Sequence, residues 1–355
     1  MKRFHFIGID MHSQFCQIAV MNSAGKVVQQ ERCDTTIPAL MAVLDQVPRP
    51  CSVVFEEGPM AGWLWRNLRG RVDDVAVAEP RRNRLISHEG DADDDIDAEK
   101  LALLHRGGMI KLVHQVESLE QAVFKQLVSV YHYRVRQRVR EAHRITHLLR
   151  QHGVVVREKG YATGEDRKKL LARLPANNIL RQMVRSLWLS YDALVKRERQ
   201  CRRRLARAAQ QIEVVRRFEE LPGFGWIRSA TLYAYMDTPW RFHSKEAMWK
   251  YLGIGLERKH SGKGPVYLGV PKITHRLLKC TILGAAKSAA AKKDNPFADL
   301  YRRWLQNGLS RQLARRNVAR RLSATMTGMW KNGTAYRPEL VVVATTATTA
   351  AKGSR

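Results

Sequence analysis

Four carboxylates in the first hundred residues have the types and spacing of a metal site that acts on phosphodiesters. Asp10 and Glu56 each close an apolar run, and Asp94 and Asp97 lie in an acidic stretch where a helix begins. Carboxylates at the ends of adjacent strands, joined by a pair at a helix start, can hold two divalent cations that clamp the attacking and leaving oxygens. The pattern predicts metal-dependent chemistry on nucleic acid, with Mg²⁺ or Mn²⁺ as the ion because all the ligands are oxygens.

Neighbouring carboxylates compete for two of these positions. Glu57 follows Glu56, and Asp93 and Asp95 flank Asp94, so strand and helix patterns alone leave both choices open. A Gly-Ile-Asp opening also occurs in sugar kinases and actin-like ATPases. Those proteins place a Gly/Thr turn for phosphate after the aspartate, whereas Met-His-Ser-Gln follows here, so a kinase is disfavoured.

The segments that must position the carboxylates alternate strand and helix signals. Strands are expected over 4–10, 15–21, 26–31, 52–56 and 75–78, and helices over 37–47, 60–68 and 98–104. A hairpin followed by alternating helices and strands predicts a mixed sheet with helices packed on it. Asp97 would then open the last helix, where a carboxylate is favoured.

Charge is divided unevenly along the chain. The net charge is +29, from 62 Lys and Arg against 33 Asp and Glu, yet residues 1–110 hold only 13 bases and 16 acids. The remaining 49 bases and 17 acids lie in residues 111–355 and predict a body that binds a polyanion. No apolar run approaches the ~20 residues of a membrane span. We therefore expect a cytoplasmic, nucleoid-associated protein without a membrane partner.

The middle of the chain predicts two long, arginine-rich helices, the first of about 35 residues and ~50 Å. We expect them to form a coiled coil or helical hairpin that also builds an oligomer. Exposed arginines at Arg202, Arg203 and Arg204 are expected to contact phosphates. The predicted apolar seam comprises Val116, Leu119, Val123, Leu127, Tyr131, Val135 and Val139, with Ile179, Met183, Leu187, Tyr191 and Leu194.

Two loops in the C-terminal third carry further candidates. Gly223 and Gly225 form a turn whose N–H groups can face a phosphate, although a tight turn between helices needs the same glycines. Ser261 lies between Lys259 and Lys263 in a Gly-rich loop, which offers a nucleophilic serine access and cations. The alternative is an ordinary loop serine.

These motifs resemble, in order and over nearly the whole chain, the DEDD-type insertion-sequence transposases of family one-ten. The resemblance implies an α/β RNase H-like (RuvC-like) domain over 1–110 and a long helical coiled-coil segment over 111–217. It also implies a mainly α C-terminal domain over 218–340, with a helix-hairpin-helix-like turn. The Ala/Thr-rich composition of 341–355 predicts a disordered tail. The matching motifs are Gly8-Ile9-Asp10, Glu56 with Gly58, Asp94–Ala98, Leu221–Gly225, Tyr251–Gly253, Ser261-Gly262, Gly269, Lys272 and Arg337–Leu340.

The resemblance further implies a DNA transposase or site-specific recombinase guided by a structured bridge RNA from its own element. Ser261 would attack DNA, the four carboxylates would hold magnesium, and Lys272 would join the residues that bind nucleic acid. The implied partners are donor and target DNA, the RNA, and further copies of the chain in a dimer or tetramer. The alternative is a metal-dependent, structure-specific nuclease, similar to a junction resolvase, in which water is the nucleophile.

Overall fold

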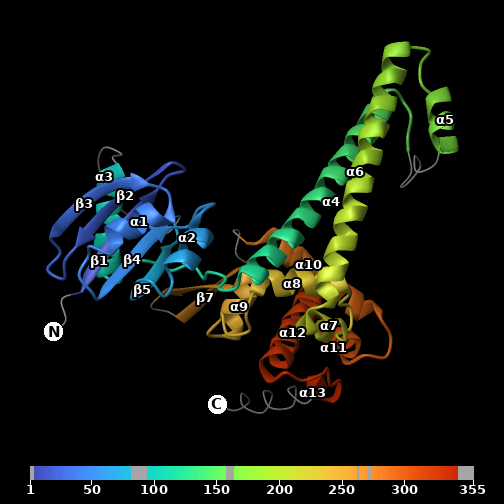
Figure 1. Cartoon of the computed structure of the whole chain (residues 1–355). Helices are drawn as coiled ribbons and strands as arrows, with labels where there is room; N and C mark the ends of the chain where they lie inside the picture. Colours follow the sequence, from blue (N-terminus) through green and yellow to red (C-terminus); the bar gives the residue numbers. More distant parts are fainter. Residues whose placement is uncertain (1–3, 81–93, 157–163, 262–263, 271–273, 343–355) are drawn as a thin grey trace, which may run out of the picture. The chain divides into compact units, whose positions relative to one another are not determined.

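The computed structural model describes residues 4–80, 94–156, 164–261, 264–270 and 274–342. The chain divides into two compact units, Met1–Leu119 and Glu120–Arg355. Each unit is described by itself below (Figure 1). The expected division of the second unit near residue 217 stays a prediction. The expected tail began two residues too early, because Val341 and Val342 end a helix, and its remaining residues 343–355 lie outside the described residues, as do Lys263 and Lys272.

The first unit is a mixed five-stranded sheet with helices, as predicted. The strand order is β3-β2-β1-β4-β5. Strand β1 pairs antiparallel with β2 and parallel with β4, β2 pairs antiparallel with β3, and β4 pairs parallel with β5. The strands are β1 (His5–Met11), β2 (Phe15–Met21), β3 (Val27–Asp34), β4 (Cys51–Glu56) and β5 (Asp74–Ala78), and the helices are α1 (Ile37–Leu44), α2 (Ala61–Leu68) and α3 (Asp94–Arg106).

The two faces of this sheet are covered by different helices. Ile7 and Phe55 point to the face where α1 and α2 supply Leu40 and Leu64, all fully buried in one apolar cluster. Because side chains alternate along a strand, the intervening residues point to the opposite face. There Val54 packs with Leu101 of α3. The α3 face is the one that carries the candidate carboxylates.

Gly8 allows α3 to lie directly on the backbone of β1. A Cβ atom at this position would stand 2.0 Å from the carbonyl oxygen of Ala98 and 2.8 Å from the amide nitrogen of Ala102. Ala98 and Ala102 are fully buried, so small residues meet on both sides of the contact. Helix α3 begins at Asp94, earlier than expected, so Asp97 lies in its first turn and does not precede it.

The second unit contains a long antiparallel helical hairpin, visible as the paired ribbons of α4 and α6 in Figure 1. Two apolar clusters define the pairing: Ile145 near the end of α4 packs with Val184 near the start of α6, and Phe124 packs with Leu205 at the opposite ends. The two helices are α4 (Leu119–Gln151) and α6 (Asn178–Gln210), each of 33 residues. The predicted pair of long helices is confirmed.

The buried stripe of this hairpin differs from the predicted seam. Val123 and Met183 are each 51% exposed, whereas the next residues, Phe124 and Val184, are buried. Among the described residues of α4 and α6, Tyr131 is the one member of the predicted seam that is buried. A helical repeat of 3.6 residues fits adjacent stripes equally well, so the period alone does not choose the face that meets the partner helix.

The helices that follow α6 surround one apolar core that includes Phe218, Ile282, Phe297 and Leu322, whereas Leu170 belongs to the cluster of Ile145 and Val184 in the hairpin. No helix in the described part of the chain is long and apolar enough to cross a membrane. The other elements are α5 (Gly164–Ala172), α7 (Glu213–Glu219), α8 (Trp226–Met236), α9 (Lys245–Tyr251), β6 (Glu257–Ser261), β7 (Gly264–Gly269), α10 (Arg276–Ala291), α11 (Pro296–Gln306), α12 (Arg311–Asn332) and α13 (Glu339–Val342).

Candidate active site

Asp10 and Glu56 come side by side at the ends of two adjacent parallel strands. The last register pair of β1 and β4 is Ile9 with Phe55, and each carboxylate is the next residue of its strand. Alternation along the strands turns both side chains to the face that α3 covers, opposite to Ile9 and Phe55. The same alternation turns Glu57 the other way, and the Glu57 amide bonds the Ala78 carbonyl at 2.9 Å. The geometry therefore favours Glu56 over Glu57.

Asp97 joins this pair through the close packing of α3. The pKa of the Glu56 carboxyl is raised, first because part of its hydration is lost and then because the negative charges of Asp10 and Asp97 oppose its ionisation. Glu56 as a residue remains exposed, so an ion from solvent has access to it. Asp10 and Asp97 thus both lie near enough to Glu56 to oppose its ionisation.

Two basic side chains accompany the carboxylates, and sequence reasoning did not select them. The Nε2 atom of His12 lies 2.9 Å from Oδ2 of Asp10, and its ring stacks on Phe15 with 4.4 Å between ring centres. The Lys100 ammonium lies 3.7 Å from Oδ1 of Asp97. The sequence held a signal for each. His12 is two residues from Asp10 at the end of a strand, and Lys100 is three residues from Asp97 on a helix, and both spacings place side chains on the same face.

The donor set fits a hard divalent cation in its chemistry, because every candidate ligand is a carboxylate oxygen. Within the described residues, no three His, Cys, Asp or Glu side chains are already placed to hold a metal ion. Asp94 begins α3, one helical turn before Asp97, while its side chain lies outside the described part. The arrangement brings Asp10, Glu56 and Asp97 near one another, and the metal site stays a prediction.

Ser261 ends strand β6, which corrects the expected loop in part. Lys259 pairs with Val266 and Ser261 pairs with Gly264, so the segment from 259 to 261 belongs to a β-hairpin. The many glycines nearby had predicted an irregular loop over 259–264, whereas antiparallel pairing extends up to the serine. The side chains of Lys259 and Ser261 lie outside the described part of the structure.

The turn at Gly223 serves the packing of helices. Gly223 has a φ of +84°, and a Cβ atom there would stand 2.2 Å from the carbonyl oxygen of Ala285 on α10. Arg228 donates a hydrogen bond of 2.6 Å to the Gly223 carbonyl. These contacts account for Gly223 without a ligand. Gly225 is exposed at the start of α8 and stays a candidate for phosphate contact.

Comparison with known proteins identifies the family. Residues 7–154 match a model of DEDD-type transposases, and residues 215–302 match a model described as the transposase IS116/IS110/IS902 family. A curated relative, the transposase for insertion sequence element IS1111A of Coxiella burnetii, is 21% identical over 291 residues. That match covers 81% of this chain and 78% of the relative. The chain belongs to the IS110 family of transposases. It is a DNA transposase, and DNA is its substrate.

The exposed arginines of this transposase lie on the hairpin where they were expected. Arg202, Arg203 and Arg204 are all exposed near the C-terminal end of α6. The Arg202 guanidinium lies 5.8 Å from the ring centre of Trp226 at the start of α8. A guanidinium held on an aromatic ring keeps its outer N–H groups open to a second partner such as a phosphate. The arrangement is compatible with the predicted contact to nucleic acid, which stays a prediction.

Proposed function

We propose that this transposase cleaves and rejoins DNA at the ends of its insertion sequence with Ser261 as the nucleophile. Asp10, Glu56, Asp94 and Asp97 are proposed to hold Mg²⁺ or Mn²⁺. The observation that supports the metal site most strongly is the placement of Asp10 and Glu56 at the ends of two adjacent parallel strands, with Asp97 near enough to oppose the ionisation of Glu56. Carboxylates that repel one another in the ion-free protein gain most from a bound cation.

In the proposed metal site, the fold holds the carboxylates of two strand ends close to the first turn of α3. Gly8 fixes the distance between the β1 backbone and α3, and so between Asp10 and Asp97. When bound, divalent cations supply charge neutralisation at a phosphodiester. In the free enzyme the Lys100 ammonium offsets part of the Asp97 charge, and the His12 ring lies in hydrogen-bond contact with Asp10. We expect both contacts to weaken when cations take their place.

The proposed chemistry conserves phosphodiester bonds. The Ser261 oxygen would form a bond to the scissile phosphorus while one DNA oxygen leaves and takes up a proton. A DNA hydroxyl would then attack the phosphoserine, lose its proton and restore the serine. Each step exchanges one P–O ester bond for another, so no external energy source is required. The serine needs a base because its hydroxyl is a weak nucleophile at neutral pH.

We also propose that the basic second unit binds a structured bridge RNA together with DNA, and that the enzyme acts as a dimer or tetramer. The support is the excess of basic residues in 111–355 and the exposed row at Arg202–Arg204. Phosphate contacts would position the nucleic acid, and base pairing with the RNA would choose the site. Affinity should then fall steeply as salt is raised.

A second candidate is a metal-dependent nuclease in which water replaces Ser261. It is favoured by one observation: the three carboxylates with described side chains all belong to the first unit, which has its own apolar core. Under this hypothesis Ser261 is a structural residue at the end of β6. The two candidates differ in whether a covalent protein–DNA bond forms.

The test is cleavage of labelled DNA carrying an element end, with the element's transcript and Mg²⁺, resolved on denaturing gels. Wild type should trap a protein–DNA adduct that alkali breaks, and Ser261→Ala should lose both adduct and cleavage while DNA binding persists. The matched control is Ser129→Ala, an exposed serine on α4. Cleavage by Ser261→Ala at the wild-type rate would establish the nuclease. Full activity of wild type in EDTA would reject the metal site in both candidates.

A further inference from the structure

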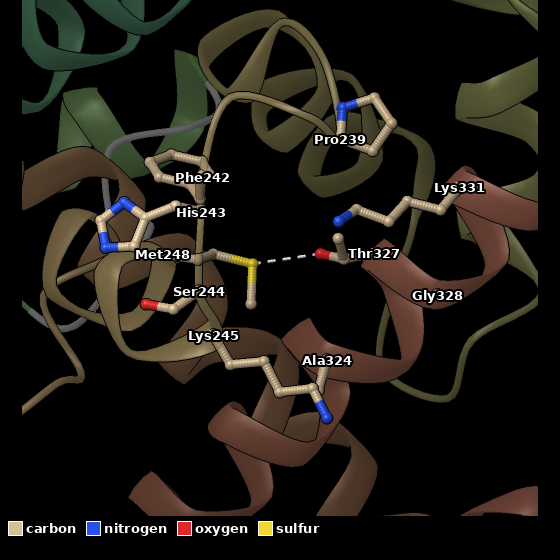
Figure 2. Close-up of a pocket in the computed structure, with 10 residues that line it drawn as sticks. All are labelled: Pro239, Phe242, His243, Ser244, Lys245, Met248, Ala324, Thr327, Gly328 and Lys331. Carbon is tan, nitrogen blue, oxygen red and sulfur yellow. Dashed lines mark hydrogen bonds between the residues drawn. The ribbon is translucent and has the colours of Figure 1, made fainter.

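A pocket in the second unit lies apart from every residue assigned above. One wall is formed by residues 239–248, which lead into α9, and the other by residues 324–331 of α12 (Figure 2). The cavity measures about 460 Å³. Sites for small ligands span roughly 300–1,000 Å³, so the pocket has room for one ligand of modest size.

The charged side chains of this pocket are all basic. Lys245 comes from the first wall and Lys331 from the second, and no Asp or Glu is among the described residues that line it. Figure 2 shows the Lys331 ammonium pointing into the cavity. The pocket therefore favours an anionic group such as a phosphate.

Aromatic surface lies beside these cations. Phe242 lines the pocket, and Trp240, two residues earlier, is 71% exposed. The Lys331 ammonium lies 4.6 Å from the centre of the Trp240 ring, which places that ring at the cationic side of the cavity. Exposed aromatic rings next to basic groups are the surfaces on which unpaired bases stack while their phosphates are neutralised.

Gly328 keeps one wall free of a side chain. It lies inside α12, where glycine weakens a helix relative to alanine, and it lines the pocket. A Cβ atom at Gly328 would meet nothing within 4 Å. Packing therefore does not require glycine here, in contrast to Gly8 and Gly223. The open position instead preserves space inside the cavity.

From the cavity, its cations, the exposed ring and the open glycine, we infer that this pocket binds one unpaired nucleotide of a DNA or RNA strand. The base stacks on the exposed ring of Trp240, and its phosphate lies near Lys245 and Lys331. This site rests on the proposed function, because it requires that the enzyme bind nucleic acid with an unpaired base. It adds recognition of bases to the backbone contacts of the basic helices.

The test compares full-length wild type with Gly328→Leu, which fills the cavity, in fluorescence anisotropy titrations. The probes are short single-stranded oligonucleotides of DNA and of RNA, each with an abasic counterpart of equal phosphate number. Because a stacked base contributes a factor of roughly five to a hundred in affinity, wild type should prefer the base-containing strand by about tenfold. The preference on the DNA and RNA probes decides which strand occupies the pocket.

Gly328→Leu should lose this preference while binding the abasic strand as wild type does. The matched control is Gln312→Leu, which adds the same side chain at an exposed position of α12 and should keep the preference. Trp240→Ala should also lose it, and thermal unfolding checks that each variant is folded. Equal binding of both strands by wild type, or an unchanged preference in Gly328→Leu, overturns the pocket and leaves the proposed function intact. Failure of wild type to bind any strand or duplex overturns both.

Discussion

Replacing Gly8 with alanine should separate the carboxylates without removing any of them. The added methyl would stand 2.0 Å from the Ala98 carbonyl oxygen, and an ordinary contact requires at least 3.4 Å. Helix α3 must therefore move away from β1 by about 1.4 Å, carrying Asp97 away from Asp10. Overpacking of this size costs ~1–3 kcal/mol of folding stability, and a misplacement near 1 Å costs about a hundredfold in rate.

The assay pairs Mg²⁺-dependent DNA cleavage with thermal unfolding of the full-length protein. We expect Gly8→Ala to remain folded at 25 °C with a lower Tm, and to cleave about a hundredfold more slowly. The matched control is Gly62→Ala in helix α2, where a Cβ would meet only the side chains of Arg66 and Gln115, at 3.4 and 3.6 Å. This control should cleave like wild type.

Cleavage by Gly8→Ala at the wild-type rate would refute the reasoning, because Asp97 would then not need its present distance from β1. A variant that loses cleavage and also unfolds below 25 °C is resolved by Gly8→Ser. Added sulfate stabilises the folded protein, and both variants are measured in it. Because Gly8→Ser places the same Cβ atom against Ala98, it should lose as much rate as Gly8→Ala. Recovery of full activity there would equally count against the model of a fixed helix position.

Three further predictions concern charge. Glu56→Gln should raise the Tm in metal-free buffer at pH 7, because the raised pKa of Glu56 means that its ionisation destabilises the fold. The gain should disappear below pH 4.5, where the glutamate is protonated in the folded and the unfolded protein. A Glu57→Gln variant whose Tm rises as much as that of Glu56→Gln would contradict this origin. Burial lowers the pKa of His132 to about 4, so stability should be full above pH 6.5 and fall by at most ~2 kcal/mol by pH 5. Titrating His132→Gln should show a flatter pH dependence, and an unchanged slope would reject this origin. Charge reversal at Arg202–Arg204 should weaken nucleic-acid binding without sequence bias and lower the salt slope by ~0.7–0.9 for each phosphate that the variant no longer neutralises; a filter-binding series with an unchanged slope would reject the interface.

The sheet was predictable because its strands carry strong local signals. The run that ends at Asp10 and the run that ends at Glu56 are short and apolar, and the hairpin strands and the helix between them give the chain length for a crossover to a parallel strand. Antiparallel pairing of β2 and β3 followed from the turn that contains Gly25. Placing both carboxylates at one sheet edge required only these assignments.

The hairpin seam was less predictable. Val123 and Phe124 are adjacent in sequence, and each continues an apolar stripe of helical period. The structure buries Phe124 because it meets α6 and the aromatic ring of Tyr233 on α8, at 5.7 Å between ring centres. Such a choice depends on a partner that is distant in sequence, so a local period cannot make it.

The contacts of the basic side chains at the site could not be predicted from the sequence, and neither could the structural roles of the glycines. His12 and Lys100 are ordinary residues until the strand end and the helix turn are built. Gly8, Gly223 and Gly328 are the same residue type in sequence, yet two of them allow close backbone contact and the third faces open space. Only the neighbours of a Cβ position distinguish these uses.

The most direct test of the central claim, that the carboxylates of the first unit form one cation site, is Mn²⁺ binding by electron paramagnetic resonance. Full-length wild type should bind Mn²⁺, and Asp10→Asn and Asp97→Asn should each lose at least tenfold in affinity without loss of fold. Asp45→Asn, which changes an exposed carboxylate at the end of α1, is the matched control and should bind like wild type. Equal Mn²⁺ affinity in wild type, Asp10→Asn and Asp97→Asn would contradict the claim.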